Sequence, residues 1–340
     1  MWRRPEGRVC MARNPALFWS NLESYEECPQ KLLWKRGHGT IDLGRGPGRG
    51  KLLPDTKKSA HHAVMGNVLS TAIEALYNEE LWRDPVNLSA RLEDLTRKEF
   101  NIQLMKNHIV WSETPDRPKW DEAAPREVLL QTCLDGILNF LKTMKRNRLL
   151  GPYARSEVEL FARVDDTPIA GRPDIIIRRD DTGLSILDGK NSSTPGKYTN
   201  PDQLKWYALC YFLAHGTMPD RLAFVYFRFP EGSPHKDYDG DPETWTGLVE
   251  VPFTKDDLKD LSHRAVETHK AITKELFDPT PSTKSCQFCD FQEVCPARIE
   301  QKAANIRKKP PKSEAEVALD SSTGIMDLGF FGGPEMGSKS

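Results

Sequence analysis

Residues 171–190, GRPDIIIRRDDTGLSILDGK, constrain the fold of this chain more than any other stretch. Residues 175–177 and 184–187 are apolar and rich in β-branched side chains, which favours buried strands. The intervening DDTG, residues 180–183, favours a turn. The stretch therefore predicts two strands joined by a turn. Asp174 would lie in the first strand, and Asp188 and Lys190 would end the second.

The open end of this hairpin concentrates charge. Side chains alternate along a strand, so Asp188 and Lys190 should share one face and Gly189 should point to the other. Two carboxylates can hold a hard cation such as Mg²⁺, which lowers the pKa of a bound water and offsets phosphate charge. A nearby lysine can orient or deprotonate that water. A hairpin with exposed acids at its ends is the alternative interpretation.

The motif order resembles a known family. Pro173-Asp174, followed by an apolar run and then Asp188-Gly189-Lys190, resembles the PD-(D/E)XK nuclease superfamily. The resemblance implies an α/β fold with a restriction-endonuclease-like core, a short mixed sheet flanked by helices. It also implies that Asp174 and Asp188 bind Mg²⁺ or Mn²⁺, helped by the Gly189 carbonyl, and that Lys190 activates water.

A helix is predicted after the hairpin, in residues 201–215, PDQLKWYALCYFLAH. Gln203 and Tyr207 are four residues apart and so share one helix face. In this position the pair resembles the Q-x-x-x-Y motif of RecB-like exonucleases, which implies that both side chains lie beside the metal and the DNA. An ordinary amphipathic helix is the alternative.

Two further stretches bear on the metal site. Residues 155–164 predict a strand that pairs with the hairpin, in which Glu157 and Glu159 share a face. The RecB-like resemblance implies a metal-proximal glutamate here, and we favour Glu157. The helix predicted over residues 59–81 departs from the family's G-x-x-x-H pattern, because Gly66 is followed by Ser70. His61 or His62 is the candidate to complete the site.

Three cysteines near the C-terminus are closely spaced: Cys286, Cys289 and Cys295 follow the pattern C-x₂-C-x₅-C. Three thiolates need a fourth ligand to hold zinc or a 4Fe–4S cluster. No histidine follows His269, and Cys28 is the obvious donor. One early and three late cysteines resemble the iron–sulfur branch of RecB-like nucleases, which includes AddB and the CRISPR-associated Cas-four-type enzymes. The resemblance implies a cluster that joins the N- and C-terminal parts, with zinc as the alternative.

Basic residues gather between residues 31 and 58, where the local excess is six positive charges. This glycine-rich segment can be an arm that contacts a phosphate backbone or a solvated mobile loop. Its GRGPGRGKL run is not a P-loop, because Arg45 replaces the first glycine and Leu52 replaces the Ser or Thr. The chain is therefore not expected to contain an ATPase site of that type.

Composition and charge narrow the classes of protein to which this chain can belong. The chain has 340 residues, of which 38% are hydrophobic, enough for a real core. No apolar run is long enough for a membrane span, and the N-terminus lacks a signal-peptide core. Seven unevenly spread cysteines do not resemble a secreted disulfide framework, so we expect a cytoplasmic protein. The net charge of −1 means that any phosphate-binding surface must be local.

The predicted organisation has three parts. A flexible extension covers residues 1–19, a RecB-like nuclease domain covers 20–300, and a disordered tail covers 301–340. The nuclease domain should also contain helices over residues 86–110, 123–148 and 254–277, and strands over 222–229 and 245–251. The tail's apolar GIMDLGFF faintly resembles peptides that bind sliding clamps, although Ile325 replaces the glutamine.

Together these features predict a metal-dependent DNA exonuclease that hydrolyses phosphodiester bonds at single-stranded or frayed ends, in recombination, repair, or phage or CRISPR DNA processing. A helicase or a recombinase is a possible partner, because the chain has no ATPase loop. The alternative is a weakly active or inactive DNA-binding module of a larger complex, which the missing helix histidine motivates. A zinc-containing RNA-processing protein is a third interpretation.

Overall fold

A computed structural model describes residues 16–36, 58–106, 108–110, 123–191, 199–230, 232–234, 238, 240–282, 285–286, 289, 291 and 295–301. The chain divides into two compact units, Met1–Asp278 and Pro279–Ser340. The predicted limits of the nuclease domain stay predictions. Most of the predicted N-terminal extension, the basic segment 37–57 and nearly all of the predicted tail lie outside the described residues. None of the described helices is long and apolar enough to cross a membrane.

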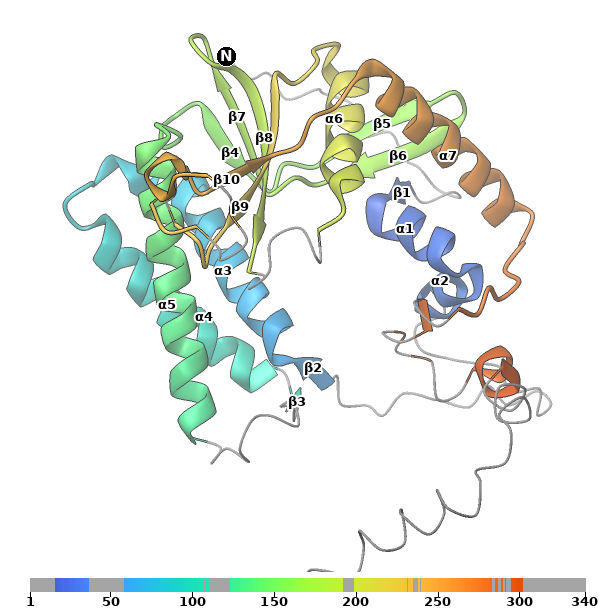
Figure 1. The fold of residues 1–340 in the computed structure, drawn as a ribbon, viewed down its shortest axis with the longest axis horizontal. Coiled ribbons are helices and arrows are strands. Elements are labelled where there is room, and N and C mark those ends of the chain that lie inside the picture. The colour runs from blue at the N-terminus through green and yellow to red at the C-terminus, as the bar shows by residue number, and fades with distance from the viewer. Residues whose placement is uncertain are drawn as a thin grey trace, which may run out of the picture. The chain divides into compact units, whose positions relative to one another are not determined.

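A mixed five-stranded sheet forms the centre of the first unit (Figure 1). Its strand order is β10-β9-β8-β7-β4, and only the β8–β9 pair is parallel. The predicted hairpin forms β7 and β8, in which Ile176 lies opposite Ile186. The bounds of the five strands are β4 Ala154–Ser156, β7 Ile175–Arg179, β8 Gly183–Lys190, β9 Arg221–Tyr226 and β10 Leu248–Glu250.

Two smaller sheets accompany the central one. The three-stranded sheet has the order β1-β6-β5, with β1 Leu17–Phe18, β6 Thr167–Gly171 and β5 Leu160–Val164. The strands β2 Lys58–Ala60 and β3 His108–Val110 pair in parallel. Because β3 follows directly after a helix, the predicted helix over residues 86–110 is shorter than expected.

The strand predicted over residues 155–164 is wrong as a single element. It is two strands: β4 pairs with β7 in the central sheet, and β5 pairs with β6 in the second sheet. The chain changes sheets at Glu157, whose φ of 54° is incompatible with a continuing strand. Glu157 and Glu159 therefore lie in a connection between strands and do not alternate along one face.

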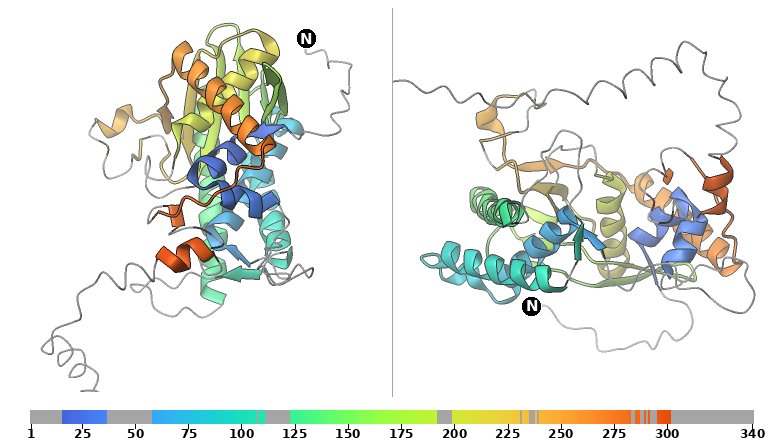
Figure 2. Two further views of the ribbon diagram at one scale, coloured as in Figure 1. Left: turned by 90° about the vertical axis from the view of Figure 1, so that its right-hand side faces the viewer. Right: turned by 90° about the horizontal axis from the view of Figure 1, so that it is seen from below.

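Helices cover both faces of the central sheet (Figure 2). One side carries α3 His61–Asn78, α4 Leu88–Lys106 and α5 Ala123–Arg146. The other side carries α6 Pro201–His215, against which α7 Lys255–Thr273 packs. Short 3₁₀ turns occur at Leu81–Arg83 and Pro242–Thr244. The sequence prediction of a short mixed sheet flanked by helices is confirmed.

The N-terminal part of this unit contains α1 Trp19–Glu27 and α2 Pro29–Arg36. Cys28 lies at the break between them, because Pro29 is well suited to the first position of a new helix. Phe18 is the N-cap residue of α1.

Each face of the sheet has its own hydrophobic core, since the side chains of β7 alternate. Ile176 packs with α6 residues such as Trp206, whereas Ile175 and Ile177 pack with α3 and α5 residues such as Phe140. The end of β8 is thereby held between two packed layers, and its polar residues are positioned by a rigid scaffold.

Candidate active site

The open end of the β7–β8 hairpin holds a buried ion pair. The Nζ atom of Lys190 lies 2.5 Å from Oδ2 of Asp188, and the Asp188 side chain is only 3% exposed. The two residues share one face of β8, as strand alternation predicted. Such a charge pair is costly to bury unless it is well partnered, so further contacts to its atoms are expected.

Gln203 on α6 provides these contacts. Its Nε2 atom donates to Oδ1 of Asp188 at 3.1 Å and to the Tyr207 hydroxyl at 3.0 Å, and its Oε1 accepts from Lys190 at 2.9 Å. The start of α6 is fixed by Pro201 and by Asn200, whose side chain accepts from the backbone N–H of Asp202. The predicted helix face therefore meets the predicted strand end.

Asp174 completes this group but lies just before β7, one residue outside the strand in which it was predicted. The preceding Pro173 has no N–H to donate, so pairing does not extend further back. The Asp174 carbonyl accepts from the Ser156 hydroxyl and from the Glu157 N–H, which anchors its backbone. Its Oδ2 atom accepts from the Gly189 N–H at 2.7 Å.

Gly189 is required by close packing. A Cβ atom at this position would lie 2.5 Å from Cζ of Phe227 and 3.4 Å from Oδ2 of Asp174. A glycine therefore lets the β8 backbone approach both Phe227 and the Asp174 carboxylate. The pattern D-G-K places the missing side chain on the face opposite to the ion pair.

The electrostatics of this group favour proton or cation binding. Burial raises the pKa of Asp174 well above its ordinary value, and the charge of Asp188 raises it further, while the Gly189 N–H opposes the change. Burial also raises the pKa of Asp188, against the opposing effect of Lys190. Burial, followed by the charge of Asp188, raises the pKa of Tyr207, which keeps its hydroxyl protonated.

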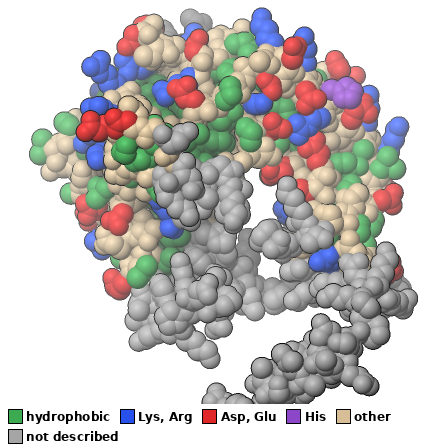
Figure 3. Space-filling view, in the orientation of Figure 1, with side chains coloured by type: hydrophobic (Ala, Val, Ile, Leu, Met, Phe, Trp, Pro, Cys, Tyr) green, Lys and Arg blue, Asp and Glu red, His purple; other side chains and the backbone are tan. Residues whose placement is uncertain are grey.

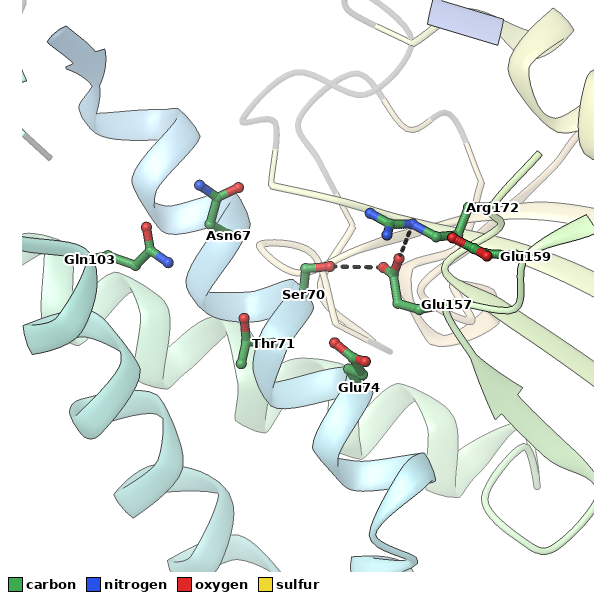
Figure 4. A pocket seen from close by; sticks show the side chains of 8 residues that line it. All are labelled: Asn67, Ser70, Thr71, Glu74, Gln103, Glu157, Glu159 and Arg172. Atoms are coloured by element: carbon green, nitrogen blue, oxygen red, sulfur yellow. Dashed lines mark hydrogen bonds and ion pairs between the residues drawn. The ribbon is translucent and has the colours of Figure 1, made fainter. Parts of the chain in front are cut away.

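Glu157 lies at the same site through contacts that the sequence did not predict (Figure 4). Its Oε1 accepts from the Ser70 hydroxyl at 3.1 Å, and its Oε2 lies 2.7 Å from Nε of Arg172. Ser70 is on α3, at the position where the RecB-like pattern has a histidine. The side chains of His61 and His62 lie outside the described residues, so their predicted role stays a prediction.

Three cavities meet around Glu157 and Ser70. One of about 420 Å³ is lined by Asp174, Gln203 and Tyr207 together with Phe18 and Arg172. A small one of about 60 Å³ lies between Asp174, Gly189 and α3. The largest, about 820 Å³, extends between α3 and α4 and is shown in Figure 4. Asp174 and Glu157 therefore line these cavities, whereas Asp188 lies buried behind them.

Two carboxylates with raised proton affinity fit a hard divalent cation, whose preferred ligands are oxygens. Among the described residues, no three His, Cys, Asp or Glu side chains are already arranged to hold a metal ion. The contacts given above explain this, because Lys190 pairs with Asp188 while Arg172 and Ser70 hold both oxygens of Glu157. Asp174 and Asp188 remain the residues best suited to bind one.

The predicted cluster ligands belong to both units: Cys28 lies in the first, and Cys286, Cys289 and Cys295 lie in the second. The Cys289 N–H donates to the Cys286 carbonyl, so these two residues lie within one turn. This turn keeps the backbones of the two residues close. The described cysteines do not form a metal-binding group, and the fit of the full set to a cluster stays a prediction.

The family model described as "PD-(D/E)XK nuclease superfamily" matches residues 19–296, and the chain belongs to this superfamily. It is 23% identical over 221 residues to the "Gene 69 protein" of Mycobacterium phage D29, an alignment that covers 63% of this chain. The chain spans 64% of the length of that phage protein. A solved structure titled "Crystal structure of SSO0001" is 15% identical, covering 72% of this chain and 89% of that one. Its TM-score of 0.30 is too low to support a structural argument.

Proposed function

We propose that this member of the PD-(D/E)XK nuclease superfamily is a metal-dependent DNA exonuclease that hydrolyses phosphodiester bonds at single-stranded or frayed ends. The observation that carries the proposal is the hydrogen-bonded group of Asp188, Lys190 and Gln203 beside Asp174. These side chains come from two separate elements, β8 and α6, whose packing brings them together. Perturbed, partnered titratable groups beside a cleft are typical of active sites.

Each residue has a role that its contacts support. Asp174 and Asp188 would hold Mg²⁺ or Mn²⁺, with the Gly189 carbonyl and Glu157 as further oxygen ligands. When bound, such an ion lowers the pKa of a coordinated water and offsets charge on the phosphate. Lys190, held by Asp188 and Gln203, orients the attacking water and neutralises charge on the phosphate.

Gln203 and Tyr207 position the DNA strand in the active site. The Gln203 amide links Asp188, Lys190 and Tyr207, so it fixes the orientation of all three side chains. Because the Tyr207 hydroxyl stays protonated, it can donate a hydrogen bond to a phosphate oxygen. The Q-x-x-x-Y spacing supports the exonuclease assignment. A role in phage recombination or DNA repair, in the cytoplasm with a helicase or recombinase as partner, belongs to the same proposal.

The test compares the purified wild type with Lys190→Ala on end-labelled single strands and on circular single strands, with Mn²⁺ present. We expect the linear substrate to be degraded and the circle to survive, and Lys190→Ala to lose activity by roughly a thousandfold. Robust activity in Lys190→Ala would contradict the proposed role of this residue. Cleavage of the circle would indicate an endonuclease instead.

A second candidate function is a DNA-binding module with little activity. Ser70, which occupies the position of the histidine in the RecB-like pattern, favours it, because a hydroxyl is a weaker metal ligand than an imidazole. The same assay separates the two candidates: binding of the labelled strand without any Mg²⁺- or Mn²⁺-dependent cleavage would support the module. Ser70→His should then be tested for gain of cleavage.

We also propose that Cys28, Cys286, Cys289 and Cys295 bind a 4Fe–4S cluster, with zinc as the alternative. The C-x₂-C-x₅-C spacing and the turn between Cys286 and Cys289 support this. Anaerobic purification followed by iron, sulfide and zinc analysis tests it. Cys28→Ser should lose iron and the visible absorption of the cluster, whereas Cys133→Ala, which removes a buried thiol of the α5 core, should keep both.

A further inference from the structure

We propose that the outer face of the three-stranded sheet β1-β6-β5 binds the single DNA strand that enters the active site. In this proposal Phe18 and Phe161 stack on bases and Arg172 contacts a backbone phosphate. The inference deepens the proposed nuclease function and rests on it. We refer to Phe18, Phe161 and Arg172 as the aromatic strip.

Strand register places the two rings on one face. Phe18 of β1 and Phe161 of β5 both lie opposite Ala170 of the middle strand β6. Residues directly opposite each other in neighbouring strands project from the same face of a sheet. The rings therefore flank the small Ala170, about 10 Å apart across two strand spacings. Each ring can take one base of an unstacked strand.

Exposure distinguishes the two rings on the edge strands, while Ala170 between them on β6 is only 1% exposed. Phe18 is 39% exposed and Phe161 is 53% exposed, whereas Leu17 and Leu160, which precede them, are 1% and 2% exposed. Leu17 and Leu160 belong to the hydrophobic core that contains α6. Three phenylalanines are exposed within the described part of the chain, and two of them are in this row. Exposed aromatic groups beside a functional cleft indicate a binding surface.

The strip is continuous with the catalytic residues. Phe18 and Arg172 line the same cavity as Asp174, Gln203 and Tyr207. Arg172 directly follows β6 and is 58% exposed in its side chain. Its Nε faces Glu157, while Figure 4 shows the terminal nitrogens directed toward the open cleft beside α3. A single DNA strand lying on the two rings would thus continue past Arg172 toward the carboxylate of Asp174.

The charge distribution favours a single strand over an ordinary duplex. Figure 3, which views the side of the unit that carries α6 and α7, shows acidic and basic side chains intermixed among the described residues, and the net charge of the whole chain is −1. Long-range attraction to a phosphate backbone is therefore weak. Stacking on aromatic side chains supplies affinity that does not depend on net charge, and it requires unpaired bases.

The first test is binding of a short fluorescent oligo(dT) in the absence of divalent cations, so that no cleavage occurs. Phe161→Ala should raise the dissociation constant about tenfold, since stacking on one base is lost. Phe161→Trp, which keeps an aromatic ring at this position, should bind about as tightly as the wild type. The matched control is Phe212→Ala, which removes the third exposed ring, on α6, and should leave the dissociation constant unchanged.

Arg172 needs a measurement that is independent of its contact with Glu157. Arg172→Gln should reduce the slope of log affinity against log salt by about 0.7, the value for one phosphate contact on a single strand. A loss of structural support around Glu157 would not change this slope. An unchanged slope would overturn the phosphate contact.

Failure of the strip and failure of the proposed function give different results. If the wild type degrades linear strands while Phe161→Ala and Phe18→Leu bind oligo(dT) as tightly as the wild type, the strip is wrong and the nuclease proposal stands. If the wild type neither binds nor cuts, both are wrong. Should Phe161→Ala fail to fold, Phe161→Leu keeps apolar packing without the ring, and wild-type affinity in that variant would equally overturn the strip.

Discussion

The two ends of the β7–β8 hairpin carry the same kind of charge pair in opposite surroundings. At the turn, Arg179 and Asp181 are 2.5 Å apart, and the Asp181 side chain is 61% exposed. At the open end, Lys190 and Asp188 are also 2.5 Å apart, but the Asp188 side chain is 3% exposed. Hydrogen bonding to Arg179 lowers the pKa of Asp181, whereas burial raises the pKa of Asp188.

The difference shows that the surroundings, and not the pairing, decide what such residues can do. A surface pair is screened by water and contributes little to stability. A buried pair is costly, and it is retained where the charges are used. At the open end α6 supplies the side chains of Gln203 and Tyr207, whereas at the turn Arg179 contacts the Arg148 carbonyl and the Tyr153 ring. Three predictions test this comparison.

The largest effect is expected from removing one carboxylate charge at each end. Asp188→Asn should lose roughly a thousandfold or more of nuclease activity, because it removes a metal ligand and the partner of Lys190. Asp181→Asn, the matched control at the turn, should leave activity unchanged. Both are measured as initial rates on labelled single strands. Equal losses in the two variants would remove the distinction between the ends.

A smaller effect, on stability, is expected from replacing the two glycines of β8, Gly183 at its start and Gly189 next to its last residue. Gly189→Ala should destabilise the protein by about 1–3 kcal/mol, because its Cβ would overlap Phe227. Gly183→Ala should also destabilise it, by about 1–2 kcal/mol, because its φ is +74°.

Only Gly189→Ala should also reduce activity, since Gly189 contacts Asp174. Denaturant titration and the cleavage assay on both variants provide the measurement. Full activity in Gly189→Ala, after correction for the folded fraction, would argue against a strict need for glycine beside the carboxylates.

The smallest expected effect is the change in thermal stability with pH that depends on Asp174. Its pKa is raised in the folded protein, so the folded state binds this proton more tightly than the unfolded state. The stabilising contribution is therefore complete below the ordinary pKa and is lost as pH rises through the raised pKa. Asp174→Asn has no proton to lose. At neutral pH it should melt about 2–4 °C above the metal-free wild type, while being inactive.

Thermal melts across pH, with and without Mg²⁺, check this expectation. Added Mg²⁺ should stabilise the wild type and leave Asp174→Asn nearly unchanged, because the cation offsets the buried charge that the variant lacks. If Asp174→Asn melts below the metal-free wild type at neutral pH, the contacts of the Asp174 carboxylate stabilise the fold by more than the burial of its charge destabilises it.

Much of the site followed from local spacing. The joint placement of Asp188 and Lys190 is a consequence of strand alternation, and that of Gln203 and Tyr207 is a consequence of helix periodicity. The turn at residues 180–182 followed from the turn-forming DDTG sequence. These rules act over a few residues, so they can be applied to the sequence without knowledge of the tertiary structure.

The errors lie where distant segments compete. Nothing within residues 155–164 shows that β4 and β5 belong to different sheets, because that division depends on the strands available as partners, β7 and β6. The positive φ of Glu157 is likewise imposed by its surroundings, since glutamate has no preference for this conformation. The contacts of Glu157 with Ser70 and Arg172 then follow from that one backbone change.

The sequence by itself determined the superfamily, the hairpin and the identity of the charged and amide side chains, because periodicity and motif order are local properties of a chain. The tertiary structure alone decided which of two similar Asp–cation pairs is buried, and that Ser70, Arg172 and Phe18 share a cleft with Asp174. Burial is a property of the whole packed unit. The same residue types therefore acquire different proton affinities at the two ends of one hairpin.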